Sequence, residues 1–279
     1  MKEEEIKFWR SVSYKIIEEV EKAISPLIGL KKSGKTLKMG ADGTPTKLID
    51  EVAEEKVIEV LKNTGKNLIL VSEEIGELKI GSGQFEIIMV VDPLDGTINA
   101  IKNIPAYAIS IAIADASNKS LNSLTIHDIE MGFVKNLVTG DLYEAFRGNG
   151  AYINKKKLVP STQKKLIGSS IGAYIRGAKI DYINKICNIV RRIRLLGSVA
   201  IELCYVVDGT YDAFLDIRGN LRIIDIAAAK LIIEEAGGII SNENGKSLNN
   251  KLNVKERTSV IASSNLNIHK DIINFMGDL

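Results

Sequence analysis

The chain has 279 residues, of which 45% are hydrophobic and 26% charged, and its formal net charge is +2 at pH 7. This is the composition of an ordinary globular protein, and the length allows one large domain or two small ones. So small a charge argues against a nucleic-acid partner, and no apolar run is long enough to cross a bilayer. The acidic N-terminus is unlike a secretory signal, and Cys187 and Cys204 have no metal-site spacing. We therefore expect a cytoplasmic protein with no membrane partner.

The first half of the chain is predicted to form two amphipathic helices and then a run of short strands. Apolar residues recur at helical spacing over residues 4–24 and 47–61. In the second helix Asp50 and Glu54 are four residues apart and so share a face. Short apolar segments between turn residues then favour an antiparallel sheet. These predicted strands are Leu68–Val71, Ile87–Val91, Ala108–Ala114, Met131–Asn136 and Asp141–Phe146.

The second half alternates strands and helices, which is typical of an α/β arrangement. Its predicted helices are Ile180–Val190, Val199–Asp208 and Asp225–Ala236. Its predicted strands are Ile167–Ser170, Arg194–Leu196, Tyr211–Leu215, Ile239–Ser241 and Ser259–Ala262. A basic segment and Pro160 separate the halves. The fold class is therefore α/β, with an α+β unit over residues 1–157 and an α/β unit over residues 158–279.

The segment from Gly29 to Thr36 matches the phosphate-loop pattern GxxxxGK[ST] of nucleoside triphosphatases. Such a loop needs a strand before it and a helix that opens at its second glycine, Gly34. The preceding residues have a helical pattern, and glycines and Pro45 follow too soon for a helix. We therefore expect a basic loop here and keep a P-loop NTPase as a remote alternative.

The most informative motif is the stretch from Val90 to Asn99, where an apolar run ends in Asp92 and Asp95. Pro93 cannot donate a ladder hydrogen bond, so the strand is predicted to end at Asp92. Gly96 allows a close backbone approach, and Thr97 is predicted to begin a helix with exposed N–H groups. Carboxylates that suit a hard divalent cation, beside amides that suit an anion, indicate metal-assisted phosphate chemistry.

The tripeptide Asp-Gly-Thr occurs three times, at Asp42, Asp95 and Asp208. Asp-Gly is a common turn former, and only the middle copy follows a buried strand and a second aspartate. We therefore interpret the first and third copies as surface turns.

The segment from Asp92 to Asn99 resembles the DPxDGTxN signature of the inositol monophosphatase superfamily, which includes fructose-1,6-bisphosphatases. The segments from Ser72 to Glu74, from Leu142 to Ala151 and from Ile224 to Gly238 resemble further family motifs in family order. Ser72 and Ile224 replace the usual Gly and Trp, and we expect altered packing from them. The sequences around Asp42 and Asp225 are most similar to those of archaeal members of this superfamily. The resemblance implies a layered αβαβα sandwich and a homodimer.

The resemblance also implies a set of metal ligands and catalytic residues. Asp92 would bridge two cations, Glu73 and the carbonyl of Leu94 would complete one site, and Asp95 and Asp225 the other. These oxygen ligands suit Mg²⁺, with two or three ions per site. Metal-activated water would attack a phosphate held by Asp95 and by the N–H groups of Gly96 and Thr97. Asp50, Glu73 and Thr97 would be the catalytic residues, with Asp50 and Thr97 orienting the water. Asp225 could also cap its helix.

The expected substrate is a small phosphorylated polyol or sugar, namely inositol monophosphate, fructose 1,6-bisphosphate or both. The family's substrate loop maps to Gly197 and Ser198, and Asp216 maps near a hydroxyl-binding position. A hydroxyl-rich and basic set is predicted to complete the substrate site: Ser170, Tyr174, Arg176, Arg191 and Arg192. Arginine suits bidentate capture of a second phosphate, although these arginines could also form a solvated face.

Other functions stay open at this point. Within the superfamily, a nucleotide 3′-phosphatase or an NAD(P) phosphatase is possible. A non-catalytic scaffold on the same fold is a further alternative, but the full carboxylate set argues against it because clustered charges are costly to keep.

Overall fold

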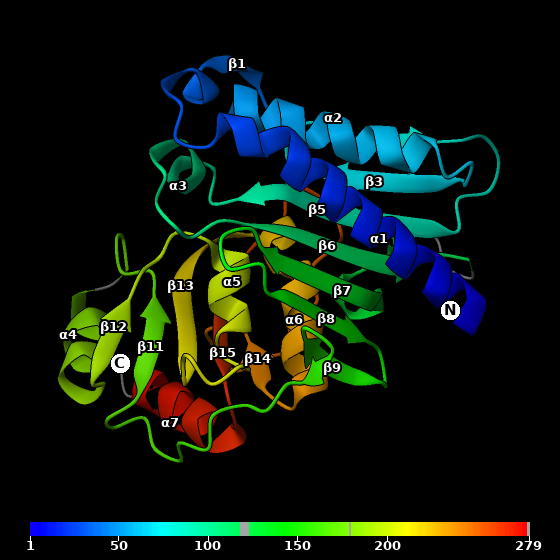
Figure 1. The fold of residues 1–279 in the computed structure, drawn as a ribbon. Coiled ribbons are helices and arrows are strands. Elements are labelled where there is room, and N and C mark those ends of the chain that lie inside the picture. Colours follow the sequence, from blue (N-terminus) through cyan, green and yellow to red (C-terminus); the bar gives the residue numbers. More distant parts are fainter. Residues whose placement is uncertain (118–122, 179, 278–279) are drawn as a thin grey trace.

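The computed structural model describes residues 1–117, 123–178 and 180–277, and it stacks helices and two sheets in layers (Figure 1). Both long N-terminal helices form within a few residues of their predicted bounds. The helices are α1 (Glu3–Ile24), α2 (Leu48–Lys62), α3 (Thr97–Lys102), α4 (Ile180–Ile189), α5 (Val199–Cys204), α6 (Ile223–Ala236) and α7 (Leu266–Gly277). In the described part of the chain no helix is both long and apolar enough to traverse a membrane.

The larger sheet contains the predicted strands of the first half, in the order β10-β9-β8-β7-β6-β5-β3-β4. Its strands are β3 (Leu68–Ser72), β4 (Gly76–Ile80), β5 (Ile87–Asp95), β6 (Ala108–Asp115), β7 (Ile129–Asn136), β8 (Leu142–Phe146), β9 (Gly150–Ile153) and β10 (Lys156–Lys157). The antiparallel prediction is right except between β3 and β5, which run parallel. Three strands of this sheet were not predicted: β4, which pairs on the outer side of β3, and β9 and β10 at the opposite edge.

The smaller sheet has the order β12-β11-β13-β15-β14. Its strands are β11 (Ser170–Ala173), β12 (Arg192–Arg194), β13 (Ala213–Arg222), β14 (Ile239–Ser241) and β15 (Arg257–Ser263). Strands β12, β11 and β13 are parallel, so their carboxyl ends share one edge of the sheet. A separate hairpin, β1 (Thr36–Met39) and β2 (Pro45–Lys47), precedes α2.

Alternation along the strands decides which helices cover which face. In β5, Ile87 and Met89 pack with α1 and α2, whereas Ile88 and Val90 face the cluster formed with α5 and α6. The smaller sheet divides in the same way, because Phe214 faces α5 and α6 while its neighbours pack with α4 and α7. The period of two in a strand therefore produces the five layers of the expected αβαβα sandwich, which is confirmed.

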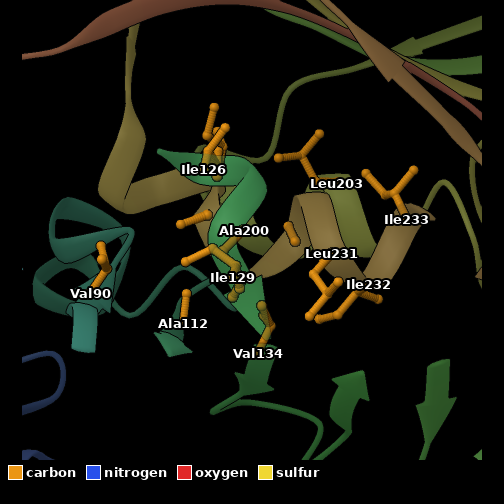
Figure 2. Close-up of a cluster of buried hydrophobic side chains, with 14 of the residues drawn as sticks. Val90, Ala112, Ile126, Ile129, Val134, Ala200, Leu203, Leu231, Ile232 and Ile233 are labelled. Atoms are coloured by element: carbon orange, nitrogen blue, oxygen red, sulfur yellow. The ribbon is translucent and has the colours of Figure 1, made fainter. Parts of the chain in front are cut away.

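Helix α6 lies in the middle layer between the two sheets. Its residues from Ile223 to Ile233 are all buried and, apart from Asp225 and Lys230, apolar, as expected for a helix that is enclosed on every side. Figure 2 shows part of this central cluster, in which Leu231 and Ile232 of α6 lie near Val134 of β7 and Ala200 and Leu203 belong to α5. The cluster draws residues from both sides of position 158, including Val90 and Val260.

Strand β5 corrects one prediction. It does not end at Asp92 but continues through Pro93 to Asp95, with a shift in register against β6 between the two aspartates. Proline is tolerated at such a bulge because the ladder does not need its missing N–H there. The extension keeps both aspartates on rigid backbone.

Other boundaries differ by a few residues. Strands β11 and β12 are displaced from the predicted Ile167–Ser170 and Arg194–Leu196, and β13 runs on to Arg222. The phosphate-loop segment forms a short 3₁₀ turn, Lys31–Gly34, and then enters β1. No helix opens at Gly34, so the requirement of a P-loop is not met.

Candidate active site

A cleft of about 540 Å³ opens where β5 ends and α3 begins. Segments far apart in the sequence line it: the turn of the β1–β2 hairpin, the turn after β3, and the junction of β13 with α6. Its lining includes Asp42, Thr44, Lys47, Asp50, Glu73, Leu94, Asp95, Gly96, Thr97, Tyr174, Gly197, Arg218, Asn220, Arg222, Asp225 and Arg257.

Four of the predicted metal ligands line this cleft, namely Glu73, Leu94, Asp95 and Asp225, and the fifth, Asp92, is buried next to them. Glu73 follows β3, Asp92 and Asp95 end β5, and Asp225 lies in the first turn of α6. Burial is the main cause that raises the pKa of Glu73 to about 8 and that of Asp95 to about 6, and neighbouring carboxylates add to it. The pKa of Asp92 is also raised, first by burial and then by Glu73 and Asp95. These side chains therefore need a cation to hold their charge.

Arg222 supplies one such cation. Its Nη1 donates to Oδ2 of Asp42 at 3.0 Å and also to Oε1 of Glu73, while its Nε lies 3.0 Å from both carboxylate oxygens of Asp225. Its Nη2 is 3.8 Å from Oδ2 of Asp92. Burial alone would lower the pKa of Arg222, but the charges of Asp225, Glu73 and Asp92 outweigh it and the pKa is raised.

The carboxylates also fit a divalent metal. Oδ1 of Asp92 accepts the N–H of Leu94 at 3.0 Å, whereas its Oδ2 is buried and has no hydrogen-bond partner. An orphaned carboxylate oxygen among three further carboxylates is what an oxygen-ligated cation requires. Within the described residues no three acidic groups form a ready-made metal cluster, and the guanidinium of Arg222 lies between them.

Asp95 is oriented by the start of helix α5. Its Oδ2 accepts the hydroxyl of Ser198 and the N–H of Ala200, both at 2.7 Å. The next residue, Gly96, has φ +91°, and a Cβ there would lie 2.8 Å from the carbonyl oxygen of Ala106. Only glycine therefore allows the chain to turn from β5 into α3 at this point.

Asp50 and Thr97 come together although they are 47 residues apart. Oγ1 of Thr97 donates to Oδ1 of Asp50 at 2.8 Å and lies 3.1 Å from the carbonyl oxygen of Leu94. Oδ2 of Asp50 accepts the N–H of Lys47, which holds the carboxylate at the start of α2. Burial raises the pKa of Asp50 to about 6, so it is a base near neutral pH.

The structure divides the predicted substrate residues. Tyr174 and Gly197 line the cleft. Ser198 is buried and donates its hydroxyl to Asp95, and Asp216 is buried in an ion pair with Arg218. Four others are absent from the lining: Ser170, Arg176, Arg191 and Arg192.

For Ser170, Arg191 and Arg192 the place in the smaller sheet explains the absence, whereas Arg176 follows β11 and still does not line the cleft. Ser170 begins β11 and pairs with Arg192 at the start of β12, whereas the cleft lies at the carboxyl ends of these strands. The four residue steps from Ser170 to Tyr174 correspond to about 13 Å of extended chain.

Comparison with known proteins agrees with this arrangement. The model of the inositol monophosphatase family matches residues 1–276. The chain belongs to the inositol monophosphatase family. It is 52% identical over 275 residues to a fructose-1,6-bisphosphatase/inositol-1-monophosphatase of Methanothermobacter thermautotrophicus, with 98% of each chain covered. The chain is therefore a phosphatase of a metal-dependent family.

Other relatives extend the comparison. A solved structure of an inositol monophosphatase–fructose 1,6-bisphosphatase superposes with a TM-score of 0.83 at 30% identity, covering 96% of this chain and 99% of the other. A bifunctional NADP phosphatase/NAD kinase of Methanocaldococcus jannaschii is 42% identical, but the match covers 96% of this chain and only 50% of that protein.

The structure corrects two readings within this inositol monophosphatase site. Asp42 is more than a surface turn, because its buried side chain accepts from Thr44 at 2.8 Å and from Arg222. Asp225 does not cap its helix, since Arg222 is the N-cap and α6 begins at Ile223. The third Asp-Gly-Thr copy is a turn, in which Asp208 accepts the N–H of Thr210.

Sequence reasoning missed several residues of the cleft, chiefly Asp42, Lys47, Arg218, Arg222 and Arg257. The repeat of Asp-Gly-Thr was a usable signal for Asp42, and the position of Arg222 three residues before Asp225 was one for the arginine. Arg218 and Arg257 come from strands whose contact with the cleft depends on the fold.

Proposed function

We propose that this phosphatase hydrolyses inositol monophosphate and fructose 1,6-bisphosphate with Mg²⁺, and that two or three ions are held by the carboxylate wall. The ligands would be Glu73, Asp92, the carbonyl of Leu94, Asp95 and Asp225. The orphaned Oδ2 of Asp92 and the raised pKa values of Glu73 and Asp95 support this assignment. Bound magnesium would neutralise charge on the transferring phosphoryl group and on the leaving oxygen.

The chain's own groups would position the water and the phosphate. In this proposal the carboxylate of Asp50 accepts a proton by way of the hydroxyl of Thr97, which lies 2.8 Å away. The N–H groups of Gly96 and Thr97, at the start of α3, hold the phosphate, and Asp95 lies beside them. The observation that carries the proposal is that the Asp50–Thr97 pair and the carboxylates of Glu73, Asp95 and Asp225 line a single cleft, with Asp92 buried next to those carboxylates.

We assign the second phosphate of a bisphosphate to Arg218 and Arg257 rather than to Arg191 and Arg192. Arg218 lines the cleft, is held by Asp216 through Nε at 2.8 Å and Nη2 at 2.5 Å, and stacks over the ring of Tyr174 with 4.9 Å from Cζ to the centroid. A guanidinium fixed on two sides loses little entropy when it captures an anion. Arg257 lines the same cleft.

Phosphate release from a panel of substrates tests the proposal. We expect turnover of inositol 1-phosphate and fructose 1,6-bisphosphate that EDTA abolishes and Mg²⁺ restores. Arg218→Ala should lower kcat/KM for the bisphosphate by roughly tenfold to a hundredfold, the loss of a charge-assisted bond, and change the monophosphate far less. The matched control is the double variant Arg191→Ala/Arg192→Ala, which should leave both substrates unchanged. A selective loss in the control instead would return the second phosphate to Arg191 and Arg192.

NADP phosphatase activity is the second candidate. Its support is the 42% identity to the phosphatase/kinase of Methanocaldococcus jannaschii. NADP and a nucleotide 3′-phosphate belong in the same panel, and turnover of NADP above that of both sugar substrates would favour this function.

The domain division, the oligomer and the location belong to the proposal as well. Residues 1–157 would supply most metal and phosphate ligands, and residues 158–279 would supply Asp225 and the substrate contacts. We propose a homodimer, which light scattering on the purified protein would test, and a cytoplasmic location, which rests on the unpaired Cys187 and Cys204.

A further inference from the structure

The guanidinium of Arg222 makes an unusual number of contacts with acidic groups. It touches Asp42, Glu73 and Asp225, and it lies 3.8 Å from Asp92. Its side chain is only 20% exposed, and the four acidic side chains are 0–15% exposed. Ion pairs with so little water around them are weakly screened.

We infer that Arg222 is a resident counter-ion that occupies the carboxylate wall before metal binds and competes with the metal for it. The inference rests on the proposed metal site, because Glu73, Asp92 and Asp225 are ligands in both descriptions. An N–H group 3.0 Å from a carboxylate oxygen uses the lone pair that a cation would use about 2.0–2.1 Å away. Binding of Mg²⁺ must therefore weaken or displace contacts of Arg222.

The same contacts explain how the metal-free wall stays assembled. The four carboxylates come from a hairpin turn, the turn after β3, strand β5 and helix α6, and they would repel one another without a cation. Arg222 stands at the junction of β13 and α6 and reaches all four segments. One fixed positive charge thus holds the ligands together, at the expense of metal affinity.

Arg222→Gln tests this, with Arg218→Gln as the matched control. Both substitutions remove one positive charge from the lining of the same cleft, but Arg218 is paired with Asp216 and contacts none of the four carboxylates. Mg²⁺ binding is measured by titration calorimetry on EDTA-treated protein without substrate, and thermal unfolding is measured with and without Mg²⁺.

We expect Arg222→Gln to bind Mg²⁺ at least about tenfold more tightly than the wild type. Its metal-free form should unfold several degrees lower, and Mg²⁺ should raise its Tm by more than it raises that of the wild type. Arg218→Gln should change Mg²⁺ affinity by less than about threefold. Arg222→Lys keeps the positive charge but loses the forked guanidinium, so its Mg²⁺ affinity should lie between those of the wild type and Arg222→Gln.

The possible failures are distinguishable. If the wild type and all variants bind no Mg²⁺, the proposed metal site is wrong. If the wild type binds Mg²⁺ but Arg222→Gln binds it no more tightly, Arg222 is not a competitor and the inference alone is refuted. Arg222→Gln with unchanged Mg²⁺ affinity but weaker binding of inorganic phosphate would make Arg222 a substrate ligand instead.

Discussion

Asp50→Asn should inactivate the enzyme without unfolding it. Asp50 accepts from Thr97 and from the N–H of Lys47, and asparagine can keep both contacts by presenting its oxygen to Lys47 and its amide to the hydroxyl. What it cannot do is accept a proton. A positioned base contributes about 10²–10⁴-fold, so kcat/KM should fall at least a hundredfold, or about 2.7 kcal/mol.

The stability of this variant can be worked out from the pKa of Asp50. Burial raises that pKa from 3.8 to about 6, so keeping Asp50 ionised at pH 7 costs the fold on the order of 3 kcal/mol. The ionised carboxylate destabilises the fold because the folded state binds the proton more tightly than the unfolded state. The cost is present above pH 6 and disappears below about pH 4, where both states are protonated. Asparagine carries no such cost, so its Tm should not fall.

The assay is phosphate release across pH 5–8 at saturating Mg²⁺, with thermal unfolding of the same samples. The wild type should lose activity as pH falls through about 6, and Asp50→Asn should lack that limb. Thr97→Val supplies the partner variant, and the double variant should be no worse than the worse single one, because the two residues would act as a unit. Activity of Asp50→Asn within threefold of the wild type, or additive losses in the double variant, would refute the reasoning.

Two further predictions concern Asp92 and Lys35. Asp92→Asn keeps the oxygen that accepts the N–H of Leu94 but replaces the orphaned Oδ2, so activity should fall at least about a thousandfold with circular dichroism unchanged. Near-wild-type turnover at saturating Mg²⁺ would contradict the metal site. Lys35→Ala changes an exposed side chain between a 3₁₀ turn and β1, so phosphate release should stay within about twofold. Loss of catalysis together with hydrolysis of ATP to ADP by the wild type would revive the P-loop interpretation.

Local patterns in the sequence determined much of this protein. The helical spacing of apolar residues predicted α1 and α2, and short apolar segments predicted β3, β5, β6, β7 and β8. This was possible because the spacing of buried residues within one element can be read from residues that are close together in the chain. The Asp92–Asn99 segment marked the site for the same reason. Its strand, bulge, glycine turn and helix start are consecutive in the chain, so one motif brings two carboxylates and two amides together.

Long-range placement was beyond the sequence. The arginines of the second half looked alike, and only the parallel pairing of β12, β11 and β13 separates Arg192 at the starting end from Arg218 near the cleft. The buried role of Asp42 depends in the same way on Arg222, which is 180 residues away. Composition and periodicity report on burial within an element, whereas a site assembled from several elements depends on how the sheets and helices are stacked, and that is decided only when the whole chain folds.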